Sequence, residues 1–245
     1  MNQQFPHDEP TETQEKPNEP AFNLPTSVLV VSLALIAVHA ISQFLSRPTY
    51  FWVIEMFAFI PAAYWVSPSE LLEPLTRFWS PVSYFFLHGD WVHLIANLIW
   101  FAAFGSAVAR RFGTARFFTF LVLSTAASAL AHFAFNATSA SPVIGASGAV
   151  SACMGAAVRF GFAPNDPRSG AMRPSMSLLQ SLSNPGILIF VVIWFAFNWL
   201  FGAGVVPMPG VEGQIAWEAH MGGFLFGLLA FAPFDPVGQR RTYLS

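Results

Sequence analysis

Long apolar segments recur along the chain and are separated by more polar connections. A helix needs about 17–25 mostly apolar residues to cross a bilayer. Six segments approach or reach that length: residues 27–45, 91–109, 115–135, 147–162, 186–204 and 215–234. The pattern therefore predicts an all-α membrane protein built as a bundle of six transmembrane helices.

A further apolar segment, residues 50–66, interrupts the pattern between the first two predicted spans. It is marginal in length and contains Glu55 and Pro61, which are both unfavourable inside a membrane helix. We interpret it as an interfacial insertion between helices 1 and 2. If it crossed the bilayer instead, only the first helix and the segment before it would change sides.

Composition favours a membrane location, since 54% of the 245 residues are hydrophobic and only 10% are charged. Soluble domains carry about 25% charged residues, so this chain has too few to cover a water-soluble surface. We therefore expect the lipid bilayer as a partner and, with no basic patch, no nucleic acid. The single cysteine, Cys153, excludes an intrachain disulfide and a Cys-x-x-Cys metal site, and nothing in the sequence requires a metal or another cofactor.

The two ends of the chain differ from its middle. Residues 1–24 are polar, acidic and rich in proline, a composition that predicts a disordered tail. This segment lacks the basic start and apolar core of a signal peptide. We expect a membrane domain over residues 25–235 and a short C-terminal tail over residues 236–245.

The distribution of positive charge predicts the orientation in the membrane. With six spans, the N-terminal tail lies on the same side as the connections after the even-numbered spans. That side carries nine basic residues: Lys16, Arg110, Arg111, Arg116, Arg159, Arg168, Arg173, Arg240 and Arg241. The other side carries Arg47 and Arg77. By the positive-inside rule both tails are cytoplasmic, and the expected location is the plasma (inner) membrane.

Four hydrogen-bonding residues lie where the even-numbered spans begin: Ser147, His220, His93 and Asn97. These spans all run from the outside inwards, so the four residues share one depth in the outer half of the membrane. Polar side chains within spans are costly and are functional candidates. The irregular backbone of residues 139–146 must then lie in protein or line a wet cavity, which would let water reach Ser147 from outside.

Small residues predict that two of these spans approach each other closely. Gly223 and Gly227 share a face with His220 on the sixth span, and Gly148 and Gly155 form a similar face on the fourth. Close approach is what a hydroxyl and an imidazole on two helices need to form a hydrogen bond.

Each feature taken singly has a structural explanation. A segment such as "GASGA" is more often a packing surface, and a membrane histidine is more often structural or part of a transport pathway. A pair such as His93 and Asn97 often links neighbouring helices. The combination of a nucleophile, a base and hydrogen-bond donors at one depth instead indicates nucleophilic catalysis.

Three motifs stand in order, each at the start of an even-numbered span: "HGDWVHLIAN" (88–97), "GASG" (145–148) and "AHMGGFLFG" (219–227). Together they resemble the rhomboid family of intramembrane serine proteases, over most of residues 25–235. The resemblance implies a rhomboid-like six-helix bundle that cleaves transmembrane protein substrates, usually after a small residue.

The resemblance also implies roles for single residues. Ser147 matches the nucleophile and His220 the general base, while His93 and Asn97 match residues that help to stabilise the oxyanion. His88 matches a histidine that is mainly structural. The glycines of the same motifs are Gly145, Gly148, Gly223 and Gly227.

Two positions depart from the family pattern. Members often have an acidic residue where this chain has Ala109, before Arg110 and Arg111. Many members also carry an aromatic residue four positions after the serine, packed on the catalytic histidine, and here that residue is Ser151. Neither change removes a catalytic atom, but both concern how rigidly the site is held.

We expect Ser147 and His220 to act as a dyad, because the nearest carboxylate, Glu218, lies on a different face of the helix. A stable transmembrane helix hides its carbonyls, so the expected substrate is a single-pass protein whose helix unwinds easily near the outer surface. One alternative is a catalytically inactive relative that binds membrane helices, although both Ser147 and His220 are present. Another is a small transporter, which should have ionisable residues in both halves of the bilayer. The sequence makes no prediction about oligomeric state.

Overall fold

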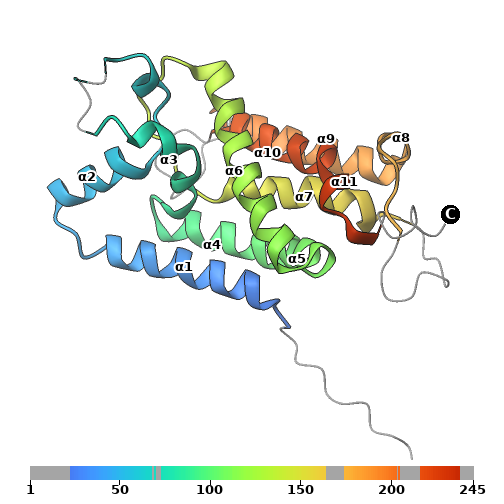
Figure 1. Ribbon diagram of the computed structural model, residues 1–245. Helices are drawn as coiled ribbons and strands as arrows, with labels where there is room; N and C mark the ends of the chain where they lie inside the picture. Colours follow the sequence, from blue (N-terminus) through green and yellow to red (C-terminus); the bar gives the residue numbers. More distant parts are fainter. Residues whose placement is uncertain are drawn as a thin grey trace, which may run out of the picture.

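The computed structural model describes residues 23–67, 69, 73–163, 174–202, 204 and 216–237 (Figure 1). Within these ranges the chain is helical, and the one β-type pairing is an isolated bridge between Phe59 and Val143. The prediction of an all-α protein is confirmed for this part of the chain. Residues 1–22 of the predicted N-terminal tail and 238–245 of the predicted C-terminal tail lie outside the described residues.

The described residues form eleven α-helices in chain order. They are α1 (Thr26–Ser42), α2 (Arg47–Phe57), α3 (Thr76–Ser83), α4 (Trp91–Trp100), α5 (Ser106–Phe112), α6 (Thr114–Asn136), α7 (Ser147–Gly161), α8 (Leu178–Leu182), α9 (Pro185–Gly202), α10 (Trp217–Leu229) and α11 (Phe231–Phe234). Single 3₁₀ turns form η1 (Pro61–Tyr64) and η3 (Tyr84–Phe86), and a π-helical turn, η4 (Phe101–Gly105), joins α4 to α5. The Asp90 carboxylate caps α4 by accepting from the His93 amide at 2.8 Å. Gly113, with φ +77°, provides the sharp turn between α5 and α6.

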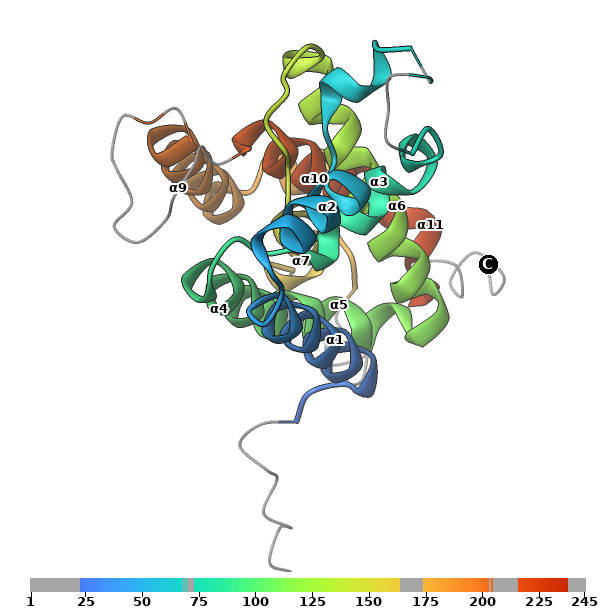
Figure 2. The ribbon, with the colours of Figure 1, turned by 90° about the vertical axis from the view of Figure 1, so that its left-hand side faces the viewer.

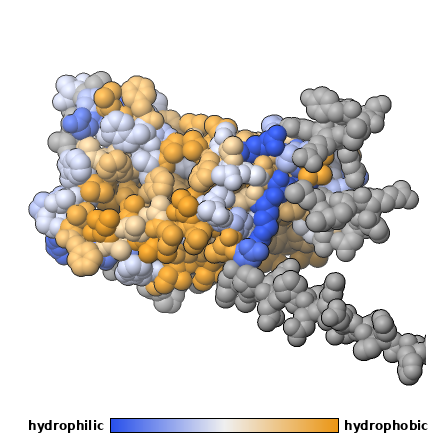
Figure 3. Space-filling model, turned by 60° about the horizontal axis from the view of Figure 1, so that its bottom comes forward, coloured by the Kyte–Doolittle hydropathy of each residue, from blue (hydrophilic) through white to orange (hydrophobic). Residues whose placement is uncertain are grey.

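Three helical segments among the described residues are long and apolar enough to cross a membrane. They are Trp91–Phe112, which comprises α4, η4 and α5, then Thr114–Asn136 and Pro185–Gly202. α1 is apolar but shorter, with 17 residues. Many large hydrophobic side chains are exposed, and hydrophobic surface covers much of the face in Figure 3, as expected where the solvent is lipid. The chain is an integral membrane protein, and the count of six spans stays a prediction.

The segment at residues 50–66 is not one continuous helix. It folds as most of α2, a short connection and η1. It contacts α3, where the Trp79 indole donates to the carbonyl of Met56 at 2.7 Å and the Tyr64 hydroxyl to that of Arg77 at 2.8 Å. It also contacts α6 and the loop before α7, since Trp65 stacks on Phe133 and Phe59 pairs with Val143. The segment therefore packs as a group of short helices beside α3, and its position at the membrane interface stays a prediction.

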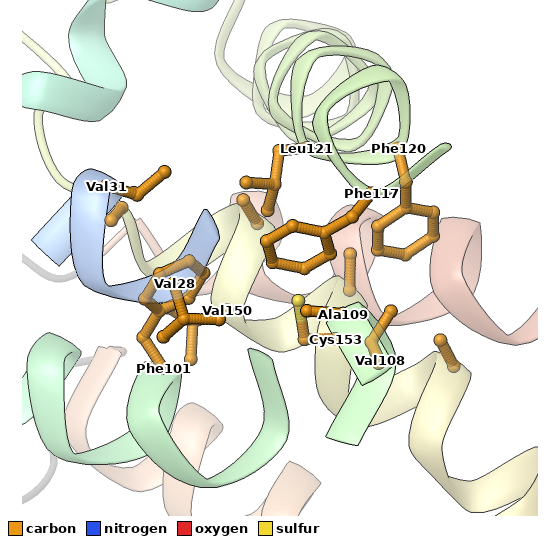
Figure 4. Packing of buried hydrophobic residues seen from close by; sticks show 14 of the residues in the cluster. Val28, Val31, Phe101, Val108, Ala109, Phe117, Phe120, Leu121, Val150 and Cys153 are labelled. Carbon is orange, nitrogen blue, oxygen red and sulfur yellow. The ribbon is translucent and has the colours of Figure 1, made fainter. Parts of the chain in front are cut away.

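α7 lies in the middle of the bundle, as the view in Figure 2 shows. Twelve of its fifteen residues are buried. Val150 and Cys153 of α7 belong to a buried cluster that also contains Phe101, Phe117 and Phe120 from neighbouring helices (Figure 4). The small residues of α7 leave room for these large rings to pack around it.

Glycines bring α7 and α10 into backbone contact. A Cβ atom at Gly227 would overlap the carbonyl oxygen of Ala152, and one at Gly155 would overlap the carbonyl oxygen of Phe224. The small-residue faces identified in the sequence thus lie against each other, which is the usual way for membrane helices to approach closely. This contact fixes the position of the N-terminal turns of both helices.

α9 lies at the edge of the bundle (Figure 2) and has only two buried residues, Ile187 and Gly202. It is joined to α10 by a ring stack between Trp194 and Phe224, with centroids 4.7 Å apart. Most of its surface is left for lipid or for a partner within the membrane.

Two arginines, Arg111 and Arg159, are buried near the C-terminal end of α7 and contact α11, the last described helix. Arg111 forms a buried two-point ion pair with Asp235, at 3.0 and 2.9 Å. Arg111 and Arg159 both lie over the ring of Phe231, at 5.4 and 5.2 Å from its centroid. Arg111 therefore pairs with a carboxylate from the end of the last helix, and not with one from position 109, where this chain has Ala109.

Candidate active site

Ser147 and His220 contact each other directly. Ser147 is the first residue of α7, His220 lies in the first turn of α10, and the serine Oγ is 2.7 Å from the imidazole Nε2. Both residues are partly exposed, whereas their helix neighbours Gly148 and Ala219 are buried. A base within hydrogen-bond reach of a serine is the arrangement that nucleophilic catalysis requires.

The loop before α7 presents Ser147 at a helix start. Gly145 has φ +118°, a conformation that side chains disfavour, and its amide donates to the carbonyl of Tyr84 at 3.0 Å. The next amide, of Ala146, donates to Nε2 of His88 at 3.5 Å. The first amides of a helix have no partner within it, so those of α7 are available at the end of the helix where Ser147 lies.

Close packing at the start of α10 brings His220 to the serine. A Cβ atom at Gly223 would overlap the carbonyl oxygen of Gly148. A Cβ atom at Gly148 would lie 2.6 Å from the hydroxyl of Ser128 on α6. Three helices therefore meet within one turn of Ser147, and larger residues at these glycines would separate them.

His93 and Asn97 lie on α4 next to the same loop. A Cβ atom at Gly145 would lie 2.8 Å from His93 Nε2 and 3.8 Å from Ser147 Oγ, so the imidazole and the hydroxyl border one glycine. Asn97 is buried, and its Nδ2 donates to the carbonyl of His93 at 2.9 Å. The structure thus brings His93 close to Ser147 and connects Asn97 to His93.

His88 lies beside His93, with ring centroids 5.0 Å apart, and contacts the same loop. It lies between η3 and α4 and is buried, with 4% of its surface exposed. Burial, together with the neighbouring His93, lowers the pKa of His88 to about 3, so its imidazole is neutral and can accept from the Ala146 amide. Its carbonyl is 3.1 Å from Nδ1 of His39 on α1. His88 therefore connects the start of α7 to α1.

Asn198 is a site residue that the sequence analysis missed. It lies on α9, and its Oδ1 is 2.6 Å from Nδ1 of His220, the ring nitrogen that does not face Ser147. A polar residue inside the apolar segment 186–204 was the signal that could have identified it, by the rule already applied to His93.

Two further positions bear on how His220 is held. Glu218 is 3.3 Å from Nδ1 of His132 on α6, so its carboxylate is engaged away from His220. Ser151 is buried on α7, one turn after Ser147, and provides no ring to pack on the imidazole. Over the described ranges, no group of three or more His, Cys, Asp or Glu side chains is placed to hold a metal ion.

Residues 75–234, well over half of the chain, match the family described as Rhomboid domain. The Rhomboid protease GlpG of Serratia proteamaculans (strain 568) is 30% identical over 166 residues, which cover 68% of this chain and 51% of that protein. The Rhomboid protease GlpG of Salmonella paratyphi A is 28% identical over 172 residues, covering 69% and 53%. The chain therefore spans about half the length of the curated relatives that it matches.

Proposed function

This chain belongs to the rhomboid family, and on that premise we propose that it is an intramembrane serine endopeptidase in which Ser147 is the nucleophile and His220 the general base. The observation that carries the proposal is the 2.7 Å contact between Ser147 Oγ and His220 Nε2. The contact joins residues from two helices that glycines pack backbone to backbone.

In the proposed reaction His220 takes the hydroxyl proton as Ser147 attacks a peptide carbonyl. The imidazolium then gives the proton to the leaving amine, and water releases the acyl group from the serine by the same route. The chain's own groups supply the nucleophile and the base, so the scheme involves no cofactor.

The oxyanion of the tetrahedral intermediate would accept hydrogen bonds from the Ser147 amide, His93 and Asn97. The amide lies at the N-terminus of α7, where the helix dipole and unpaired N–H groups favour negative charge. His93 is supported by its place beside Gly145, and Asn97 by its bond to the His93 carbonyl.

The proposed substrate is a single-pass membrane protein cleaved near the outer surface. Its helix must open locally, because a continuous helix keeps its carbonyls in its own hydrogen bonds. Gly, Pro and other helix-weakening residues near the outer surface would lower the free energy of opening. The family resemblance adds a preference for a small residue before the cut.

The proposed arrangement has six crossings, formed by α1, α4 with α5, α6, α7, α9 and α10, with α2 and η1 in the outer interface. The excess of basic residues on the tail side supports a cytoplasmic N-terminus in the plasma membrane. In that orientation Ser147 and His220 open to the outer side. The membrane domain would cover residues 25–235.

The test is co-expression with a panel of tagged single-pass proteins that carry Gly, Pro or small residues near the outer surface. We expect cleavage products and labelling by a fluorophosphonate probe with the unaltered chain. Ser147→Ala and His220→Ala should abolish both, whereas Ser151→Ala, one turn away on α7, should retain both. Products that persist in Ser147→Ala, or an unaltered chain that the probe does not label, would overturn the proposal.

A further inference from the structure

Asn198 connects α9 to the histidine of the proposed pair. Its Oδ1 lies 2.6 Å from Nδ1 of His220, and its Nδ2 donates to the carbonyl of Trp194, one turn earlier on α9, at 2.8 Å. On the other side of the ring, Nε2 of His220 lies 2.7 Å from Ser147 Oγ. These contacts form one hydrogen-bonded chain from α9 through α10 to α7.

The hydrogen bond on α9 determines which atom is the donor and which the acceptor in each of the other bonds. A main-chain carbonyl can only accept, so Trp194 requires Nδ2 of Asn198 as the donor and leaves Oδ1 facing the imidazole. Oδ1 also only accepts, so His220 must carry its proton on Nδ1. A neutral imidazole has one such proton, which leaves Nε2 free to accept from Ser147. This is the tautomer that a base acting on Ser147 needs.

We infer that Asn198 is a positioning residue that holds His220 in this tautomer and orientation. The inference rests on the proposed function, because it concerns the same reaction. When Nε2 takes the proton of Ser147, the Nδ1–H···Oδ1 bond stays in place and stabilises the positive ring. The proton on Nε2 then passes to the leaving amine, and Asn198 neither gains nor loses a proton. The expected dyad is thus extended by a neutral amide from a third helix.

This contact supplies a constraint that α7 does not provide. Ser151 stands where many relatives have an aromatic residue packed on the histidine, so the imidazole needs another support. The contact is itself braced, because the ring of Trp194 stacks on Phe224, one turn beyond His220 on α10. Since only Ile187 and Gly202 of α9 are buried, the contacts of Trp194 and Asn198 with α10 are the ones that orient α9 toward His220.

The kinetic test compares Asn198→Ala with Asn198→Asp and with Val192→Ala, an exposed position on the same helix. A hydrogen bond to a group that becomes charged is worth about 10- to 100-fold in rate, so we expect kcat of Asn198→Ala to fall by that factor with little change in KM. Asn198→Asp keeps an acceptor toward Nδ1 and should recover most of the loss, and Val192→Ala should match the unaltered chain.

The thermal midpoint of each variant in detergent separates positioning from general support of the fold. For a positioning residue, Asn198→Ala loses kcat while its Tm stays near that of Val192→Ala. An Asn198→Ala enzyme with unaltered kcat would overturn the inference. The inference would also be overturned if Asn198→Asp lost as much kcat and as much Tm as Asn198→Ala.

Nitrogen-15 NMR of labelled histidines gives a readout that does not depend on proteolysis. The His220 signals are assigned by their loss in His220→Ala, and we expect a ring protonated on Nδ1 in the unaltered chain and a mixture of tautomers in Asn198→Ala. A ring protonated on Nε2, or a tautomer unchanged by Asn198→Ala, contradicts the inference. A chain that shows the expected tautomers but cleaves no substrate would refute the proposed function alone.

Discussion

Asn97 and Asn136 make the same local hydrogen bond in different parts of the molecule. Each donates Nδ2 to the carbonyl of a histidine four residues earlier, Asn97 to His93 at 2.9 Å and Asn136 to His132 at 3.3 Å. Only Asn97 lies on the helix that carries a side chain beside Gly145 and Ser147. The two residues therefore allow the local effect of such a bond to be separated from an effect on catalysis.

Replacing Asn97 by alanine should lower kcat by about 10²- to 10³-fold, the usual loss when one oxyanion donor is removed. Asn136→Ala removes the same kind of bond from α6 and should leave kcat nearly unchanged. Turnover of a cleaved substrate and Tm in detergent are measured for both variants. If the two variants lose activity to the same extent, the bond of Asn97 stabilises its own helix, and Asn97 does not stabilise the oxyanion.

The positions of polar residues within the predicted spans indicated which side chains could lie at the same depth in the membrane. Two features of the site could not be predicted in this way. Ser147 and His220 start two predicted spans that run in one direction, so their shared depth was expected from the order of the predicted spans. Asn198 reaches the same place from near the end of α9, so its distance from the start of its own helix does not indicate that it meets His220. The direction of the bond to Trp194 depends on the rotamer, which no spacing rule contains.

At the scale of helices, the contact between α7 and α10 is limited by backbone atoms. The carbonyl of Ala152 lies where a side chain at Gly227 would begin, two turns along α10 from His220. Backbone oxygens in a helix cannot rotate away as a side chain can. The separation of the two helices is thus set by the absence of side chains at the glycines.

We expect Gly227→Ala to push α10 away from α7. Overpacking of this kind destabilises by about 1–3 kcal/mol, and the displaced His220 should also slow labelling of Ser147 by a fluorophosphonate. Gly161→Ala is the control, because a Cβ atom there meets nothing within 4 Å and the residue ends α7. Chemical denaturation and the labelling rate measure the two effects, and a Gly227→Ala chain that labels at the unaltered rate would show that the glycine face does not position His220.

The lengths of the apolar segments predicted where helices lie in the sequence, but not their internal geometry or their exact lengths. The segment 91–109 is found as α4 and α5 joined by the π-helical turn η4, and nothing in the hydrophobic pattern marks that turn. In the structure a Cβ atom at Gly105 would lie 2.8 Å from the ring of Phe101, so packing within the turn explains the glycine. The segments 147–162 and 215–234 were predicted as spans, but the helices found in them, α7 and α10, have only 15 and 13 residues.

At the scale of the whole molecule, the ion pair between Arg111 and Asp235 joins the end of α5 to the residue that follows α11. Both side chains are buried, with 4% and 2% of their surfaces exposed. The two side chains form two hydrogen bonds with each other, and the Asp235 carboxylate also accepts from the Val237 amide at 3.1 Å. The ring of Phe160 lies 4.7 Å from the Arg111 guanidinium carbon. The pair thus holds the last helices against the middle of the bundle, at the end away from Ser147.

Removing one member of this pair should be more damaging than removing both. Asp235→Leu or Arg111→Met leaves a buried charge without its partner and should destabilise by about 3–5 kcal/mol, whereas the double variant replaces both charges by apolar groups and should recover part of that loss. Arg116→Ala, at an exposed arginine on α6, controls for the loss of a positive charge and should change little. Denaturant titration in detergent measures the four variants. Because the pair is remote from the serine, variants that remain folded should keep the unaltered labelling rate, and strictly additive losses in the double variant would show that the two charges do not stabilise the bundle as a pair.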